Sequence, residues 1–281
     1  MKHKLSSLCS QVVQADTLLQ TPNAKRLFIE ARLGAIPEDE LKSYREGHIH
    51  GAVYAQIRDV FAAPPTPESG NLPLPELEDL RRQLERWHVD NDTEIVLYGP
   101  SMALAARGWW VLRWAGLTNV RVLDGGLKAW VNHGGAVAQG DCVPAAKSAP
   151  APLMLQAGGM PSISVAEMES LPADVVLIDA RDEASYLAGC IPHARNLAAS
   201  EQWTPASNLR TVSEIRRLYD SVGATANADI VVYCGGGVLS ALEVLTLDAL
   251  GIPSRLFVGS WSEWNKCPRR MALSASERVV A

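Results

Sequence analysis

Short apolar runs alternate with stretches of helical periodicity along the whole chain. The clearest run, residues 230–233, is rich in β-branched residues and is typical of a buried parallel strand. Apolar residues recur at helical spacing between Leu77 and Trp87, and again between Leu104 and Trp114. This alternation predicts an α/β fold in which helices cover both faces of a parallel sheet.

The same order of signals occurs twice. Four segments of one half match four segments of the other: residues 27–32 with 176–181, 44–52 with 186–194, 94–99 with 229–234, and 125–130 with 259–264. Since the last two pairs are separated by nearly the same number of residues, the register is consistent. We therefore expect two tandem domains, at residues 1–140 and 161–281. Residues 141–160 are rich in Ala, Pro and Gly and are predicted to be the linker.

Composition excludes several classes of protein. A length of 281 residues suits two domains, and the net charge of −5 without a basic tract argues against a nucleic-acid partner. The sequence has neither an apolar run long enough for a membrane span nor the apolar core of a signal peptide. Five cysteines, an odd number without a CxxC pair, indicate a reducing compartment such as the cytoplasm, and no metal or cofactor is expected.

A cysteine and three glycines follow the strand at residues 230–233. Glycine permits backbone turns that other residues avoid, so the N–H groups of residues 235–237 can converge on one point. The helical stretch at 240–250 adds the positive end of its dipole. Such surroundings lower a cysteine pKa from ~8.5 to roughly 3.5–7.5, so we predict that Cys234 is a nucleophile. A structural cysteine beside a glycine turn is the alternative. Gly99 stands at the matching position of the first half, which therefore lacks a nucleophile there.

These motifs resemble those of tandem-domain rhodanese-like sulfurtransferases over nearly the whole chain. The shared motifs are the strand-ending acidic-x-Arg at 30–32 and 179–181, Gly-His-Ile-x-Gly-Ala at 47–52, Gly-Gly-x-x-x-Trp at 125–130 and Gly-Ser-Trp-x-Glu-Trp at 259–264. The resemblance implies two rhodanese-like domains, a non-catalytic first and a catalytic second. It also implies ping-pong sulfur transfer through a cysteine persulfide. The family's active loop corresponds to Cys234 and the substrate-binding positions Gly235, Gly236, Gly237, Val238 and Leu239.

The loop resembles the Cys-Gly-Ser-Gly-Val-Thr loop of mercaptopyruvate sulfurtransferases more than the Cys-Arg-Lys-Gly-Val-Thr loop of thiosulfate-using rhodaneses. It departs from both at Leu239, which replaces the threonine, and Gly236 replaces the serine of the first. In the resembled enzymes that serine is proposed to act with a first-domain histidine and aspartate. These correspond to His48 and Asp39, which we predict as catalytic. The alternatives are that His48 packs a loop and that Asp39 begins a helix.

Two arginines are predicted to hold the carboxylate of a donor, Arg181 in the second half and Arg32 in the first. A structural ion pair with a neighbouring acidic residue is the alternative for Arg181. The second arginine of the family falls at Ser185. Cys190 could act as a resolving thiol for Cys234 only within disulfide reach, which a sequence leaves open.

Mercaptopyruvate is the expected sulfur donor, because the loop offers neither lysine nor arginine to a compact dianion such as thiosulfate. A thiol, cyanide or a thiol protein such as thioredoxin is the expected acceptor. Thiosulfate sulfurtransferase activity is the alternative. A phosphatase is disfavoured, since Ser240 stands where such a loop is closed by arginine. A catalytically weak rhodanese-like binding or regulatory module is the alternative from another class.

Overall fold

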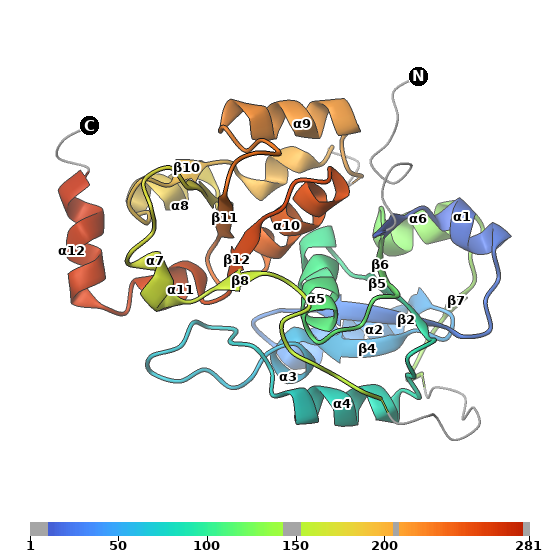
Figure 1. The fold of residues 1–281 in the computed structure, drawn as a ribbon. Helices are drawn as coiled ribbons and strands as arrows, with labels where there is room; N and C mark the ends of the chain where they lie inside the picture. Colours follow the sequence, from blue (N-terminus) through green and yellow to red (C-terminus); the bar gives the residue numbers. More distant parts are fainter. Residues whose placement is uncertain (1–10, 143–152, 205–207, 278–281) are drawn as a thin grey trace.

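The computed structural model describes residues 11–142, 153–204 and 208–277 (Figure 1). Two five-stranded sheets of parallel strands form the two halves, which confirms the predicted α/β fold. The first sheet has the order β1-β6-β5-β2-β4: β1 Val12–Val13, β2 Arg26–Arg32, β4 Val53–Gln56, β5 Glu94–Tyr98, β6 Val120–Leu123. The second has the order β10-β9-β11-β12-β8: β8 Ser162–Ile163, β9 Val176–Asp179, β10 Arg195–Asn196, β11 Ile230–Tyr233, β12 Arg255–Phe257. A small antiparallel pair, β3 His48–Ile49 and β7 Val137–Ala138, stands apart from the first sheet.

Helices cover both faces of each sheet. The helices of the first half are α1 Ala15–Gln20, α2 Pro37–Glu46, α3 Ile57–Val60, α4 Leu77–Arg86, α5 Met102–Trp114 and α6 Gly126–Asn132. Those of the second half are α7 Val165–Met168, α8 Glu183–Ala188, the 3₁₀ helix η2 Ala199–Gln202, α9 Val212–Ser221, α10 Leu239–Ala249, α11 Ser260–Trp264 and α12 Pro268–Glu277. The predicted helices at 77–87 and 104–114 correspond to α4 and α5, whose apolar residues are buried.

Equivalent tyrosines repeat the same hydrogen bonds in both halves. In the first, the Tyr98 hydroxyl donates to Glu30 at 2.7 Å and accepts the Ile49 N–H at 3.0 Å. In the second, the Tyr233 hydroxyl donates to Asp179 at 2.6 Å and accepts the Ile191 N–H at 3.0 Å. The corresponding strands also occupy corresponding places in the two sheets, so the sequence repeat is a structural repeat.

The two halves share one hydrophobic core. Helix α5 packs against α10 near the middle of the molecule (Figure 1). Buried residues of both helices, among them Trp109 and Leu242, belong to a single apolar cluster that continues from one sheet to the other. Smaller clusters cover the outer faces, with Trp130 in the first half and Trp264 in the second. Both tryptophans are therefore packing residues.

The described part of the predicted linker packs against the protein. Leu153 and Met160 are buried in the shared core. The N–H groups of Gln156 and Gly159 donate to Ala115 at 3.0 Å and to Trp114 at 2.9 Å, just beyond and at the end of α5. Residues 143–152 lie outside the described ranges. Within those ranges the model contains no helix that is both long and apolar enough to cross a membrane.

Candidate active site

Cys234 is the first residue after β11, where the strand leaves the sheet toward α10. Its side chain is only 1% exposed. The backbone here is fixed to the beginning of α11. The Cys234 N–H donates to the Ser260 hydroxyl at 3.2 Å, and the Cys234 carbonyl accepts the Trp261 N–H at 2.9 Å. The Gly235 carbonyl likewise accepts the Ser262 N–H at 2.9 Å. These hydrogen bonds hold the Cys234 loop, residues 234–239, to α11 of the same domain.

Donors of the same loop and helix surround the sulfur. The N–H of Gly237 donates to Sγ of Cys234 at 3.1 Å, as the glycine cradle predicted. The buried hydroxyl of Ser240 lies 3.3 Å from the same sulfur. The Ser260 hydroxyl is 4.0 Å away and lies 2.9 Å from the Phe257 carbonyl, to which it donates. Negative charge that develops on Sγ is therefore stabilised by two hydrogen-bond donors, the N–H of Gly237 in the turn and the hydroxyl of Ser240 in α10. The dipole of α10 adds to their effect.

Only one of the three glycines is required by its backbone geometry. Gly237 has φ +82°, and a Cβ there would lie 2.8 Å from the Val258 carbonyl oxygen. A Cβ on Gly235 would meet open space, and one on Gly236 would make ordinary contacts with Asn71 and Ser262. The turn that aims the Gly237 N–H at the sulfur is thus specific to glycine at this position.

The first domain closes one side of the loop. Its 69–74 segment approaches α11, where the Asn71 N–H donates to the Ser262 hydroxyl at 2.9 Å. Gly70 is packed so closely against Gly259 that a Cβ on Gly70 would lie 2.5 Å from the Gly259 carbonyl oxygen. A groove of about 430 Å³ follows this contact between the two domains, lined by Ser69 and Gly70 on one side and Val258 and Gly259 on the other. The candidate site therefore lies at the domain interface.

A family model of the rhodanese-like domain matches this chain twice, at residues 12–133 and 164–267. The chain belongs to the rhodanese family. The first match spans all five strands of the first sheet, and the second spans the second sheet except its edge strand β8. The tandem organisation implied by the resemblance is therefore confirmed.

Relatives of this chain are named as sulfurtransferases of two kinds. It is 32% identical over 243 residues to the putative thiosulfate sulfurtransferase SseB of Mycobacterium tuberculosis, with 81% of this chain and 84% of the relative covered. It is 32% identical over 251 residues to a probable 3-mercaptopyruvate sulfurtransferase of Pseudomonas aeruginosa, with 83% and 87% covered. The crystal structure of SseA, a 3-mercaptopyruvate sulfurtransferase of Escherichia coli, matches with a TM-score of 0.77 at 26% identity, covering 90% of this chain and 99% of that one. This chain is a sulfurtransferase.

The structure places His48 and Asp39 in the first domain, without a contact to the loop. The His48 ring is buried, stacks on Tyr44 with centroids 4.1 Å apart, and has Nδ1 3.0 Å from the Tyr44 carbonyl oxygen. Asp39 is exposed in the first turn of α2. Among the described residues, the contacts found for either side chain join it neither to the other nor to Cys234. Their catalytic role stays a prediction that these contacts do not favour.

Both predicted carboxylate-binding arginines form ion pairs. Arg181 donates to the Asp179 carboxylate at 2.5–3.1 Å and to the Gly189 carbonyl at 2.6 Å. Its guanidinium also lies 4.8 Å from the ring centroid of Trp261, the residue bonded to the Cys234 carbonyl. Arg32 pairs with Glu30 at 2.6 Å and Glu40 at 3.3 Å. Arg181 is thus the nearer of the two to the loop, although its Nε and Nη2 already donate to Asp179 and Gly189.

Cys190 and Cys234 belong to different sides of the second sheet. Cys190 packs against the apolar cluster of the outer face, whereas Cys234 is part of the core shared with the first domain. Within the described ranges, Cys142, Cys190, Cys234 and Cys267 are all outside disulfides. These positions give no support to a resolving role for Cys190.

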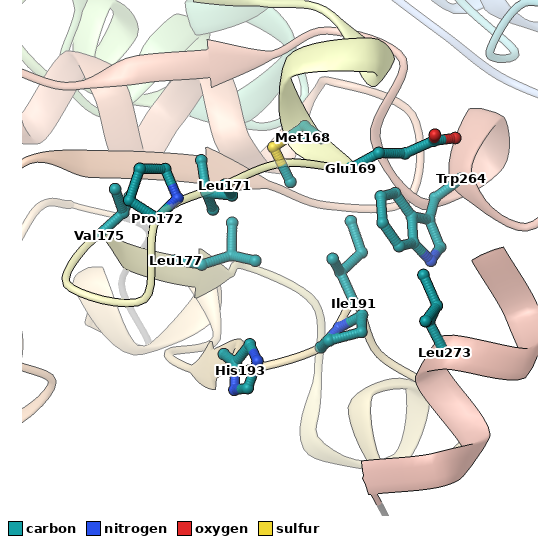
Figure 2. Close-up of a pocket in the computed structure, with 11 residues that line it drawn as sticks. Met168, Glu169, Leu171, Pro172, Val175, Leu177, Ile191, His193, Trp264 and Leu273 are labelled. Atoms are coloured by element: carbon teal, nitrogen blue, oxygen red, sulfur yellow. The ribbon is translucent and has the colours of Figure 1, made fainter.

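A separate cavity of about 240 Å³ opens on that outer face (Figure 2). Apolar side chains from several elements point into it, including Leu177, Ile191 and Leu273, with His193 at its edge. Since its lining residues do not include any of the Cys234 loop, it is distinct from the candidate active site.

Proposed function

We propose that this sulfurtransferase moves one sulfur atom from mercaptopyruvate to a thiol or cyanide through a persulfide on Cys234. The observation that carries the proposal is the 3.1 Å contact between the Gly237 N–H and Sγ of Cys234. A donor preset on the sulfur stabilises the thiolate before attack and lies beside the persulfide afterwards. The Ser240 hydroxyl adds a second donor at 3.3 Å.

The chemistry proceeds in two balanced steps. In the first, the Cys234 thiolate attacks the sulfur of mercaptopyruvate, an S–S bond forms, and the C–S bond breaks with its electron pair moving to the methylene carbon. That carbon takes up the proton lost by the donor thiol, so pyruvate and a persulfide anion result. In the second, the acceptor attacks the outer sulfur, the S–S bond breaks, and the thiolate is restored.

Two residues of the first domain are proposed carriers of the proton in the first step. His48 and Asp39 correspond to the groups that the family resemblance assigns to proton transfer. Their packing within the first domain, with His48 stacked on Tyr44, gives this part of the proposal no direct support.

The choice of donor rests on charge. Thiosulfate is a compact dianion, and positions 235–239 supply backbone N–H groups without a cation. One missing charge-assisted hydrogen bond changes binding by roughly 1.5–3 kcal/mol, or about ten- to hundredfold. Mercaptopyruvate needs only one carboxylate held, and Arg181, stacked on Trp261, is the proposed partner, with Arg32 as a more distant one.

The presence of cysteines outside disulfides supports a reducing compartment, the cytoplasm, where a thiol protein such as thioredoxin would serve as acceptor.

The ratio of kcat/KM for the two donors, measured with cyanide as the common acceptor, tests the proposal. We expect the ratio to favour mercaptopyruvate by about tenfold or more. A ratio clearly favouring thiosulfate would contradict the donor assignment and leave the persulfide chemistry intact. Turnover with neither donor would indicate a binding or regulatory module instead.

A further inference from the structure

Helix α5 of the first domain places an arginine deep in the domain interface. Arg107 lies in the middle of this helix, and its side chain is 0% exposed. Nη2 donates to two carbonyl groups of its own domain, Phe61 at 3.1 Å and Leu72 at 2.9 Å. These bonds hold the guanidinium at the side of the 69–74 segment that faces the second domain.

The charge of Arg107 is not compensated by a carboxylate. Within the described ranges its guanidinium forms no ion pair, and its buried Nε and Nη1 have no hydrogen-bond partner. Transfer of an unpaired cation into a protein interior is costly, so a buried arginine normally has an anionic partner. The anion that compensates the charge of Arg107 must therefore lie on the side of the guanidinium that carries Nη1.

Nη1 faces the Cys234 loop. A Cβ built on Gly237 would lie 3.0 Å from Nη1, so this nitrogen lies against the residue whose N–H donates to Sγ of Cys234. Burial lowers the pKa of Arg107 to about 10, and the negative charge of Cys234 opposes that effect. The guanidinium is thus protonated at neutral pH and coupled to the sulfur.

We propose that Arg107 is a positioning residue of the sulfurtransferase, which supplies from the first domain the counter-charge for the sulfur anion on Cys234. The proposal rests on the proposed function, because that anion is the thiolate and persulfide of the transfer cycle. It also gives the first domain, whose own loop has Gly99 in place of a nucleophile, a part in the chemistry of the second.

The other charged groups near Cys234 either have partners or are acids whose pKa burial raises. Arg181 beside β9 is paired with Asp179. Glu243 of α10 accepts a hydrogen bond from Tyr219 at 2.6 Å, and burial raises its pKa to about 8. Burial also raises the pKa of Glu263 on α11. The 69–74 segment has no titratable side chain. Arg107 is therefore the uncompensated cation among these groups.

The pH dependence of alkylation at Cys234 tests the inference. Full-length protein is treated with iodoacetamide in the absence of a donor, and modification is followed by mass spectrometry of the peptide that contains Cys234. In Arg107→Met we expect the pH midpoint to move upward and the rate at pH ~7 to fall about tenfold or more, since an opposite charge is removed. Arg107→Lys should recover most of the rate. Arg113→Met, on the same helix but bonded to Thr118, is the matched control and should alkylate as wild type.

Wild-type alkylation in Arg107→Met would overturn the inference. Alkylation needs no sulfur donor, so its outcome can be separated from that of the proposed function. If Arg107→Met slows alkylation as expected but wild type does not transfer sulfur, only the proposed function is contradicted.

Arg107→Gln is a second variant for the case that Arg107→Met does not fold, because its amide can still donate to the Phe61 or Leu72 carbonyl while the charge is lost. It should alkylate at pH ~7 about as slowly as Arg107→Met. Alkylation of folded Arg107→Gln at the wild-type rate would overturn the inference.

Discussion

The hydroxyl of Ser240 lies 3.3 Å from Sγ of Cys234, and its side chain is completely buried in the first turn of α10. The resembled enzymes carry a hydroxyl one position earlier, where this chain has Leu239. Ser240 thus supplies the sulfur with the hydroxyl that the loop sequence itself lacks.

Replacement of Ser240 by alanine should weaken transfer without unfolding the protein. A hydrogen bond to a charged group contributes about 1.5–3 kcal/mol, so we expect kcat/KM to fall roughly tenfold or more. Steady-state kinetics with cyanide as acceptor measures the change. Ser221→Ala, which removes a hydroxyl from the exposed end of α9, is the control. Equal activity of Ser240→Ala and wild type would show that this hydroxyl does not act on the sulfur.

The glycines of the loop should differ sharply in their tolerance of alanine. Gly237→Ala forces φ +82° on a residue with a Cβ and presses it to 2.8 Å from the Val258 carbonyl oxygen, so the loop must shift. Because misplacement of a reacting group by about 1 Å costs roughly a hundredfold in rate, we expect kcat to fall by about that factor. Gly235→Ala has open space and should retain the fold. Comparable losses of melting temperature in both variants would contradict the described turn.

Gly236→Ser should be accommodated and should favour the mercaptopyruvate reaction. A Cβ at this position would lie 3.8 Å from Cβ of Asn71 and 4.0 Å from Oγ of Ser262, which are ordinary contacts. The change restores the loop serine of the mercaptopyruvate enzymes that this chain resembles. We therefore expect an unchanged melting temperature and a higher kcat/KM for mercaptopyruvate relative to thiosulfate. A rise for thiosulfate instead would weigh against the donor assignment.

Much of the architecture was predictable because it depends on local patterns. The strand at 230–233 and the helices at 77–87 and 104–114 show clear periodicity, and the sequence repeat predicts two equivalent domains. The Cys234–Gly237 turn was predictable for the same reason, since cysteine and glycine are adjacent in the chain.

The contribution of the first domain to the site was not predictable. Arg107 is separated from Cys234 by more than a hundred residues, and on its helix it interrupts an otherwise apolar face without a motif that would identify it. Positions 235–239 of the loop lack a cation, but the folded protein places Arg107 beside Gly237. Ser240 carried a weak signal, as a polar residue in the first turn of an apolar helix.

Glu243 should make the stability of the protein decrease with rising pH. Burial raises its pKa from 4.5 to about 8, so the folded state retains a proton that the unfolded state releases. Each unit of such a shift corresponds to about 1.4 kcal/mol, and the loss occurs between about pH 4.5 and 8. Glu243→Gln should flatten the dependence of the melting temperature on pH over this window. Glu46→Gln, at the exposed end of α2, should leave it unchanged. A Glu243→Gln curve parallel to wild type would contradict the buried, protonated carboxyl.

The most direct test is the intact mass of the protein after incubation with mercaptopyruvate and removal of excess donor. Wild type should gain the mass of one sulfur atom and lose it when cyanide is added. Cys190→Ser should behave in the same way, whereas Cys234→Ser should gain nothing and still show a wild-type circular dichroism spectrum. A gain of sulfur by folded Cys234→Ser, or none by wild type with either mercaptopyruvate or thiosulfate, would contradict the account.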